Sequence, residues 1–273
     1  MTWHITDFPI GVGAFNPRAL PNLLAWYDAS DSSTCLNNTS PITPATNGQT
    51  VTQWTDKSGN GNHLTQGTGI SQPVVATNAL NGKQVLNFDG SNDSCVTGFS
   101  FALAATKTLT AFVVAKSDLS TAATFLALHR SGQPDYSSCF SSLVVSSELW
   151  LQTGLGDGGL SASSYRVMKY APTITSYFIQ STRISTSALS QRTNGVNASL
   201  TLQSGTMLQS SWMSSGSGNY RLICGAREGS TDNTPDTFHD GQFAEVILYN
   251  AVLSDANTQR VERYLGSKWG IVV

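Results

Sequence analysis

The sequence has little charge. Asp, Glu, Lys and Arg make up only 12% of its 273 residues, which is half of the share of about 25% usual in soluble domains. The 15 basic and 17 acidic residues give a formal net charge of −2. A protein that contacts several phosphates needs a basic stripe, and this composition does not supply one. A nucleic-acid partner is therefore excluded.

Long apolar runs are absent as well. The sequence contains no stretch of about 18 apolar residues, the length that a membrane-spanning helix needs. Membrane insertion is therefore not expected. The first residues, MTWHITD, lack the basic segment and the apolar core of a signal peptide, so export by the common route is not expected either. The hydrophobic share of 40% is enough for a sizeable core and excludes disorder for most of the chain.

Cysteine motifs are missing too. Cys35, Cys95, Cys139 and Cys224 lie far apart and never form a CxxC pair, so they carry no metal-site signature. Without a signal peptide, the expectation is four reduced and mostly buried thiols. The alternative is a disulfide that forms after release into an oxidising medium, and the sequence does not determine its pairing.

Uncharged polar residues and 24 glycines take the place of the missing charge. Thr and aromatic residues suit pleated faces, whereas Gly, Asn and Asp suit turns, so the composition predicts an all-β protein. Short apolar runs alternate with turn clusters at the spacing of a sandwich or barrel. The strands are predicted at residues 23–27, 50–54, 84–88, 109–116, 124–129, 140–145, 149–153, 165–170, 176–184, 198–202, 220–225 and 242–249.

The two ends of the chain differ from this pattern. Residues 1–22 combine prolines and glycines with scattered apolar side chains, which predicts an extended N-terminal arm ahead of one domain at residues 23–273. The apolar side chains of this arm pack either on the domain or on a neighbouring subunit: Trp3, Ile5, Phe8, Ile10 and Phe15.

One short helix is predicted near the C-terminus. Ser254 is placed to cap its first turn. Val261, Tyr264, Leu265 and Trp269 follow at helical spacing and form one apolar stripe. We expect this stripe to lie against the β domain.

Three stretches resemble a known family when they are taken together. They are LLAWYDAS at 23–30 with WTDKSGNGNHL at 54–64, then LNGKQVLNFDG at 80–90, and finally FAEVILY at 243–249 with YLGSKWG at 264–270. In this order and spacing they resemble the laminin-G-like, concanavalin A-like jelly-roll domains of many bacteriophage virion proteins and bacterial surface proteins. The resemblance covers about residues 23–273 and implies an antiparallel two-sheet sandwich.

The residues of these stretches fit structural roles. Trp26 and Trp54 are expected in the core, and Asn81-Gly82 is expected to form a turn between strands. Asp56 and Ser58 are expected to accept hydrogen bonds from the backbone of the glycine-rich loop that follows them. These motifs therefore indicate fold and say little about function, because this sandwich serves many functions.

Catalytic motifs are absent. Relatives of this fold that hydrolyse β-glucans carry a Glu-x-Asp-x-x-Glu strand, whereas the four Glu residues of this chain are isolated. No Gly-x-Ser-x-Gly turn occurs, and the four His residues have no triad or metal-site context. The sequence therefore predicts a protein that is not an enzyme, and glycoside hydrolysis is the least favoured function.

A calcium ion is compatible with the sequence, although no cofactor is expected to be required. Jelly rolls of this type often hold calcium at a rim through side-chain and backbone oxygens. Asp89, Asn92 and Asp93 are the candidate ligands, with a second oxygen cluster at 232–236. The alternative for both segments is a turn held by hydrogen bonds from Asx side chains.

A sugar site needs an exposed aromatic platform with polar side chains around it. The segments at 212–220 and 228–240 contain both kinds of residue, as does the surrounding of Trp150. The candidate carbohydrate-binding residues are Trp212, Asn219, Asp232 and Asn233. The alternative is that these aromatic residues belong to the core.

Two functions follow from these observations. The first is a non-enzymatic structural protein on the surface of a bacteriophage virion, as a capsid decoration or a tail or fibre component. Its N-terminal arm would anchor it to other virion proteins, and it is expected to form a homo-oligomer. The alternative is a carbohydrate-binding adhesin that recognises a host cell-surface glycan, with or without calcium.

Overall fold

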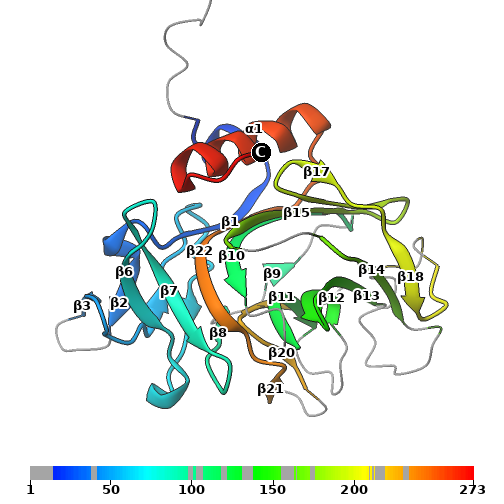
Figure 1. The fold of residues 1–273 in the computed structure, drawn as a ribbon. Coiled ribbons are helices and arrows are strands. Elements are labelled where there is room, and N and C mark those ends of the chain that lie inside the picture. Colours follow the sequence, from blue (N-terminus) through cyan, green and yellow to red (C-terminus); the bar gives the residue numbers. More distant parts are fainter. Residues whose placement is uncertain are drawn as a thin grey trace, which may run out of the picture.

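The fold is a sandwich of two antiparallel β-sheets with one helix on its outer surface (Figure 1). A computed structural model describes residues 15–37, 42–97, 101–102, 107–117, 122–130, 138–154, 163, 165–172, 176–208, 210, 212, 219–229 and 234–273. This architecture confirms the predicted all-β jelly-roll class. It also confirms the single helix near the C-terminus.

The first sheet has the order β17-β16-β15-β10-β22-β7-β6, and β1 pairs with β22 beside this path. Every pairing in it is antiparallel. Its strands are β1 (Leu23–Asp28), β6 (Val74–Leu80), β7 (Lys83–Asp89), β10 (Leu109–Ser117), β15 (Phe178–Ile184), β16 (Leu189–Thr193), β17 (Val196–Asn197) and β22 (Asp240–Tyr249).

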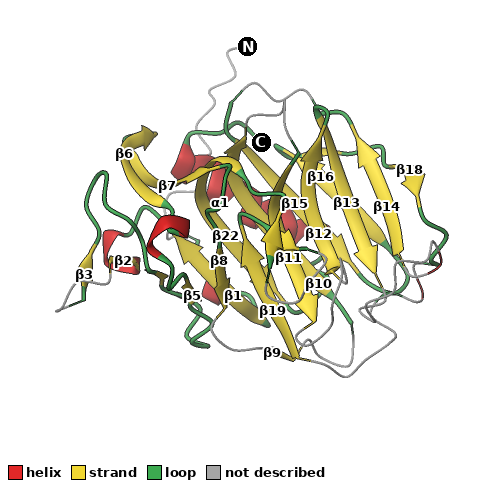
Figure 2. Cartoon of the chain, turned by 90° about the horizontal axis from the view of Figure 1, so that it is seen from below, coloured by secondary structure: helices red, strands yellow, loops and turns green. Residues whose placement is uncertain are grey.

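The second sheet has the order β18-β14-β13-β12-β11-β19-β8-β5-β4-β2-β3, and β9 pairs with β19. Figure 2 shows its long strands side by side. They are β2 (Cys35–Asn37), β3 (Thr43–Pro44), β4 (Gln53–Trp54), β5 (Leu64–Thr65), β8 (Cys95–Thr97), β9 (Phe101–Ala102), β11 (Ala123–Arg130), β12 (Ser138–Val145), β13 (Glu148–Gly154), β14 (Tyr165–Tyr170), β18 (Thr201–Ser204) and β19 (Asn219–Cys224).

Smaller elements complete the fold. A separate two-stranded hairpin consists of β20 (Arg227–Glu228) and β21 (Pro235–Asp236). Three short 3₁₀ helices are η1 (Pro17–Ala19), η2 (Ser32–Thr34) and η3 (Gly69–Ser71). The predicted strand at 50–54 is shorter than expected, because only β4 is regular there and Thr50 makes an isolated bridge to Val74.

The helix α1 (Asp255–Trp269) covers the first sheet (Figure 1). The hydroxyl of Ser254 accepts a hydrogen bond from the backbone N–H of Asn257, which is the predicted cap. Val261, Leu265 and Trp269 are buried in a second apolar cluster between the helix and the sheet, as the periodicity predicts. The part of the chain that the structure describes contains no helix that is long and apolar enough to cross a membrane.

The space between the two sheets holds the main core. Its large side chains are fully buried and include Tyr27, Trp54, Phe88, Phe125 and Phe243. Trp54 therefore lies in the core as predicted, and Trp26 is buried beneath α1 instead. Cys35, Cys95 and Cys224 are free thiols in this core, which agrees with the expectation for these three, whereas the side chain of Cys139 lies outside the described residues.

The glycine-rich loop after β4 is held as expected. The carboxylate of Asp56 accepts hydrogen bonds from the backbone N–H groups of Trp26, Ser58 and Asn62. The hydroxyl of Ser58 accepts from the N–H of Asn60. These bonds satisfy buried backbone donors, so Asp56 and Ser58 have the structural role that the sequence predicts.

The structure describes the last part of the N-terminal arm, residues 15–22. Residues 15–22 pack on the domain, because the Phe15 ring lies 5.7 Å from the Tyr264 ring of α1 and Leu20 is buried. The hydroxyl of Tyr249 also donates to the carbonyl of Pro17 at 3.1 Å. For residues 15–22 the alternative of packing on the domain therefore holds, and the domain boundary at residue 23 stays a prediction. Trp3, Ile5, Phe8 and Ile10 lie outside the described residues, and their anchoring role stays a prediction.

Candidate functional site

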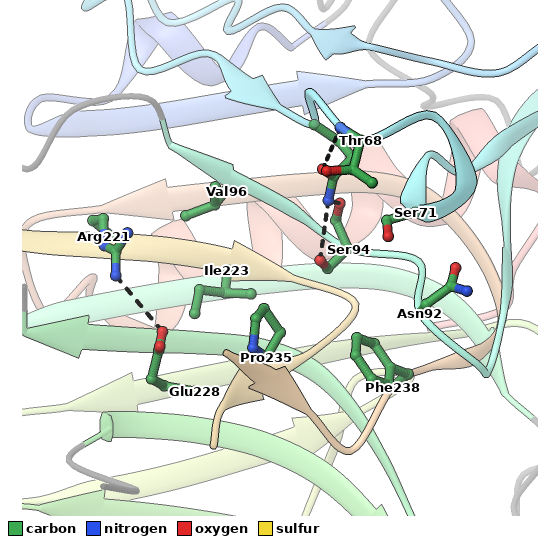
Figure 3. Close-up of a pocket in the computed structure, with 11 residues that line it drawn as sticks. Thr68, Ser71, Asn92, Ser94, Val96, Arg221, Ile223, Glu228, Pro235 and Phe238 are labelled. Carbon is green, nitrogen blue, oxygen red and sulfur yellow. Dashed lines mark hydrogen bonds and ion pairs between the residues drawn. The ribbon is translucent and has the colours of Figure 1, made fainter. Parts of the chain in front are cut away.

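A cavity of about 320 Å³ lies on the outer face of the second sheet (Figure 3). Its floor comes from β8 and β19. Successive strand residues point to opposite faces of a sheet. Because Leu222 and Cys224 point into the main core, Arg221 and Ile223 point outward into the cavity. Val96 on β8 pairs directly with Ile223 and extends this floor.

The hairpin β20–β21 forms one wall of the cavity. The chain leaves β19 at Gly225, whose φ of +83° suits glycine and where an added Cβ would collide with the Phe88 ring. The hairpin then returns over the outer face and presents Glu228, Pro235 and Phe238. Phe238 and Val96 pack against a small buried cluster that includes Ile223, so this side of the cavity is apolar.

The opposite wall is polar. It consists of Gln66 and the segments around η3 and β8, and its other lining residues are Thr68, Ser71, Asn92 and Ser94. The amide nitrogen of Gln66 donates to the carbonyl of Ser94 at 2.9 Å, and its amide oxygen accepts from the N–H of Thr68 at 2.9 Å. These bonds, drawn in Figure 3, hold the rim in place before any ligand arrives.

One end of the cavity carries charge. The carboxylate of Glu228 is buried, with Oε2 3.7 Å from Nη2 of Arg221 and 4.0 Å from Nε2 of His129. Its Oε1 accepts a hydrogen bond from the N–H of Thr234 at 2.9 Å. His129 is fully buried and pairs directly with Arg221 across β11 and β19. Arg221 is the partly exposed member, so its guanidinium is the group that a ligand meets.

The arrangement suits binding. An apolar floor matches the C–H face of a sugar ring, amide and hydroxyl groups match its hydroxyls, and a guanidinium matches a carboxylate. Glu228 is the one carboxylate among the described residues that line the cavity. Glycoside hydrolysis usually needs a pair of carboxylates about 5–9 Å apart, so the described lining does not offer that chemistry.

The sugar-site residues expected from the sequence are not brought together here. Trp212 is fully buried in the main core, so the expectation that it forms an exposed platform is wrong, and the alternative of a core aromatic holds for it. Asn219 starts β19, but its side chain lies outside the described residues, as do Asp232 and Asn233. Trp150 is half-buried on β13, where its indole N–H donates to Glu148 at 3.3 Å.

The calcium candidates form a turn. Asp89 Oδ1 accepts from the N–H groups of Ser91 and Asn92, and Asp93 Oδ2 accepts from the N–H of Asp89. The alternative of a turn held by Asx side chains is therefore confirmed for this loop. Burial and the nearby Asp89 charge raise the pKa of Asp93 to about 6. The described residues contain no group of three or more His, Cys, Asp or Glu able to hold a metal ion, and calcium stays a prediction.

Sequence reasoning found the residues that line the cavity only in part. The segment 228–240, named for a sugar site, contributes three of them, and Asn92 was named only as a calcium candidate, whereas Gln66 and Arg221 were missed. Gln66, Asn92, Arg221 and Glu228 come from four separate segments, and no local motif connects them. One feature of the sequence could have indicated Arg221, because it is a charged residue between apolar neighbours in a predicted strand. The sequence does not show which face of that strand lies outward, or that a hairpin covers it.

Comparison with known proteins identifies the fold and no family. No family profile and no curated protein matches the sequence. The receptor-binding domain of botulinum neurotoxin C/D mosaic serotype is similar in structure, with a TM-score of 0.55 and 10% identity over 92% of this chain and 55% of that one. The serotype D ligand-binding domain in complex with N-acetylneuraminic acid has a TM-score of 0.53, with 9% identity over 92% and 54%.

A sialidase is similar as well. Trypanosoma rangeli sialidase in complex with sialic acid has a TM-score of 0.56 and 12% identity, over 90% of this chain and 33% of that one. This chain thus spans about half the length of the toxin domains and a third of the sialidase. At these identities the similarity shows that the β-sandwich is shared by binding domains and by an enzyme.

Proposed function

We propose that this protein is a carbohydrate-binding β-sandwich and that the cavity beside Arg221 is its glycan site. The observation that carries the proposal is the composition of the cavity wall. It joins the apolar surface of Val96, Ile223 and Phe238 to a polar rim and one guanidinium. A pocket that recognises an acidic glycan combines these three kinds of surface.

A sialylated glycan is the first ligand to consider. Two similar structures are described with N-acetylneuraminic acid or sialic acid bound, which supports the carbohydrate-binding alternative more than the virion structural role. In this chain the carboxylate of such a sugar would pair with the guanidinium of Arg221. Glu228 would hold that guanidinium in place from behind.

The position of the cavity suits a displayed binding domain. Figure 1 shows the C-terminus and the first described residues beside α1, whereas β20 and β21 lie at the opposite end of the molecule. An attachment through either terminus therefore leaves the cavity open to solvent. The virion-surface location, the contact with other virion proteins and the homo-oligomer expected from the sequence stay predictions.

The test is a calorimetric titration with 3′-sialyllactose and, separately, with lactose. We expect 3′-sialyllactose to bind more tightly, because only it carries a carboxylate for Arg221. Arg221→Gln keeps hydrogen-bonding capacity but removes the charge, and we expect it to weaken 3′-sialyllactose at least about tenfold. Arg260→Gln on the exposed face of α1 is the matched control and should leave binding unchanged.

Two results would contradict the proposal. One is the absence of heat with both sugars while the protein is folded by circular dichroism. The other is a folded Arg221→Gln protein that binds 3′-sialyllactose as tightly as the original chain does. The same samples show whether N-acetylneuraminic acid is released, which we do not expect from a lining with one carboxylate.

A further inference from the structure

A second cavity lies at the edge of the sandwich where β14, β17 and β18 end. It measures about 610 Å³ and is bounded by the end of β14, by the turn that joins β16 to β17, and by β18. In Figure 1, β17 of the first sheet lies above β14 and β18 of the second sheet on the same side of the molecule. The cavity therefore opens where the two sheets end together.

Two of its lining residues reach into the space between the sheets. Tyr170 comes from the second sheet and packs against the main core, and its hydroxyl makes a hydrogen bond with the Thr193 hydroxyl of the first sheet. Burial raises the pKa of Tyr170 to about 12, so this hydroxyl stays neutral at physiological pH. Tyr170 and Thr193 thus form the inner wall of the cavity.

Behind this wall the interior is polar. Residues 180, 182, 191 and 193 share the inward face of β15 and β16 with the core residues Phe178 and Ile184. Gln180 and Gln191 are each only 2% exposed. Ser142 on β12 faces them from the second sheet and donates a hydrogen bond to Gln180. We call this group, Ser142, Tyr170, Gln180, Thr182, Gln191 and Thr193, the polar layer.

The polar layer is not satisfied by the protein itself. Among the described residues, neither amide atom of Gln191 has a hydrogen-bond partner, and the amide nitrogen of Gln180 has only the electrostatic interaction with the Tyr170 hydroxyl. Burying such groups without partners costs free energy, and native proteins normally supply water or a ligand to them. Gln180 pairs directly with Thr193 across β15 and β16, so it lies immediately behind the cavity wall.

We propose that this edge cavity is a second binding site, for a neutral hydroxyl-rich ligand of the size of a mono- or disaccharide. The ligand would lie against Tyr170 and Thr193. Neither glutamine lines the cavity, so a water behind this wall would connect the ligand to the amides of Gln180 and Gln191. Amides and hydroxyls both donate and accept, so they match sugar hydroxyls. The volume lies in the range of small-molecule sites.

The carboxylate of Glu148 at the mouth of the cavity disfavours an acidic ligand. Glu148 lines the cavity, and its carboxylate is already paired with Lys169 at 2.9 Å. It also accepts from the indole N–H of Trp150. An added carboxylate would meet this charge without a cation left to pair with it in the lining, whereas a neutral sugar would not. The two cavities therefore differ in the charge of the ligand that each takes.

The experiment is an NMR titration of the full chain that follows the side-chain amides of Gln180 and Gln191. The probes are galactose, glucose, N-acetylglucosamine, lactose and maltose, each added alone, and galacturonate as the acidic counterpart of galactose. We expect at least one neutral sugar to shift both amides in a saturable manner, and galacturonate to shift neither.

Two variants locate the binding. Thr193→Val keeps the shape of the side chain and removes one lining hydroxyl, and we expect it to weaken that sugar at least about tenfold. Gln191→Leu removes the inner amide and should also weaken it. Thr77→Val, the same change on the exposed edge of β6, is the control and should not alter binding.

Three outcomes would overturn the proposal. They are no shift of these amides with any neutral sugar, equal affinity in folded Thr193→Val and Gln191→Leu, or amides that exchange magnetisation with water alone while no sugar binds. The proposal does not depend on the glycan site beside Arg221. Its failure leaves the sialyllactose titration unaffected, and Arg221→Gln should not change the response of these amides.

Discussion

Two buried polar side chains on the two faces of the first sheet differ in their hydrogen bonding. Glu245 on β22 points toward α1, and each of its two carboxylate oxygens accepts two hydrogen bonds. The indole N–H groups of Trp26 and Trp269, the hydroxyl of Tyr264 and the ammonium of Lys268 each donate to it at 2.7 Å. Gln191 on β16 points the other way, between the sheets, and has no side-chain partner among the described residues.

The difference indicates two roles. Glu245 stabilises the fold, whereas the amide of Gln191 is available to a ligand or a water molecule. The partners of Glu245 come from β1 and α1, so this one carboxylate joins three segments and fastens the helix to the sheet. Burial raises the pKa of Glu245, and Lys268 opposes that change. Gln191 joins nothing, so the fold gains no visible stability from its amide.

His239 is intermediate between Glu245 and Gln191, because only one of its two ring nitrogens has a hydrogen-bond partner among the described residues. It is fully buried among the rings of Phe88, Phe125 and Phe243. Its Nε2 lies 3.1 Å from the carbonyl of Lys116, whereas its Nδ1 has no partner among the described residues. Burial lowers the pKa of His239 to about 3, so the ring is neutral in the folded protein at physiological pH.

The largest effect is expected for Glu245→Ala. Removing this carboxylate leaves the indole N–H groups of Trp26 and Trp269 buried without an acceptor and leaves Lys268 with Asp28 alone, which costs about 3–5 kcal/mol of the free energy of unfolding. Urea denaturation measures it. Glu148→Ala removes a carboxylate from the partly exposed pair with Lys169 and is the matched control, with little expected change. Equal losses in the two variants would refute the role given to Glu245.

Lys268→Met should cost less, about 2 kcal/mol. The methionine replaces the apolar stem of the lysine, and Trp26, Tyr264 and Trp269 still donate to Glu245. What is lost is the charge that Lys268 shares between Glu245 and Asp28, 2.7 and 2.6 Å away. Thermal unfolding together with urea denaturation gives the value. If Lys268→Met lowered the free energy of unfolding as much as Glu245→Ala does, the charge of Lys268 and not the neutral donors would account for the stabilising role of Glu245.

His239→Phe should change the pH dependence of stability. The folded pKa is about 3 and the ordinary value is 6.5, so the unfolded chain binds a proton first as the pH falls. The free energy of unfolding is therefore independent of His239 protonation above pH 6.5. Below pH 6.5 it falls by about 1.4 kcal/mol per pH unit because the unfolded chain binds the proton. Urea denaturation at pH 7 and pH 5 should show about 2 kcal/mol less loss for His239→Phe, and parallel profiles would contradict this.

Gln191→Leu is expected to have the smallest effect on stability, within about 1 kcal/mol in either direction. A leucine of similar size removes the unpartnered amide and adds apolar contact inside the sandwich. The free energy of unfolding by urea is the measurement, without any sugar present. A loss above about 2 kcal/mol would mean that the amide has partners that stabilise the fold, and the contrast with Glu245 would disappear.

Much of the fold was predictable because local patterns specify it. The strands β7, β10, β12, β13 and β22 were found from apolar runs, and α1 was found from its cap and stripe. The strand β16 was missed for a physical reason. Its inward residues include Gln191 and Thr193, so it shows no apolar alternation although it lies inside the sheet.

The site was less predictable, because no periodic pattern encodes it. Trp212 was expected at the surface and is in the core, since burial of an aromatic residue depends on which segment covers it. The resembling stretches supplied Trp26, Glu245 and Trp269, which meet at one structural centre far from the cavity walls. A motif that recurs for architecture therefore does not mark the place where a ligand binds.

The sequence by itself determined the β class, the turn positions and the amphipathic helix, because backbone preferences and alternation act over a few neighbouring residues. Only the tertiary structure decided which face of β19 lies outward, what covers it and which polar residues face each other between the sheets. Those outcomes depend on pairing between segments as distant as β8 and β19. They set the two cavities, and with them the ligands that this protein is proposed to bind.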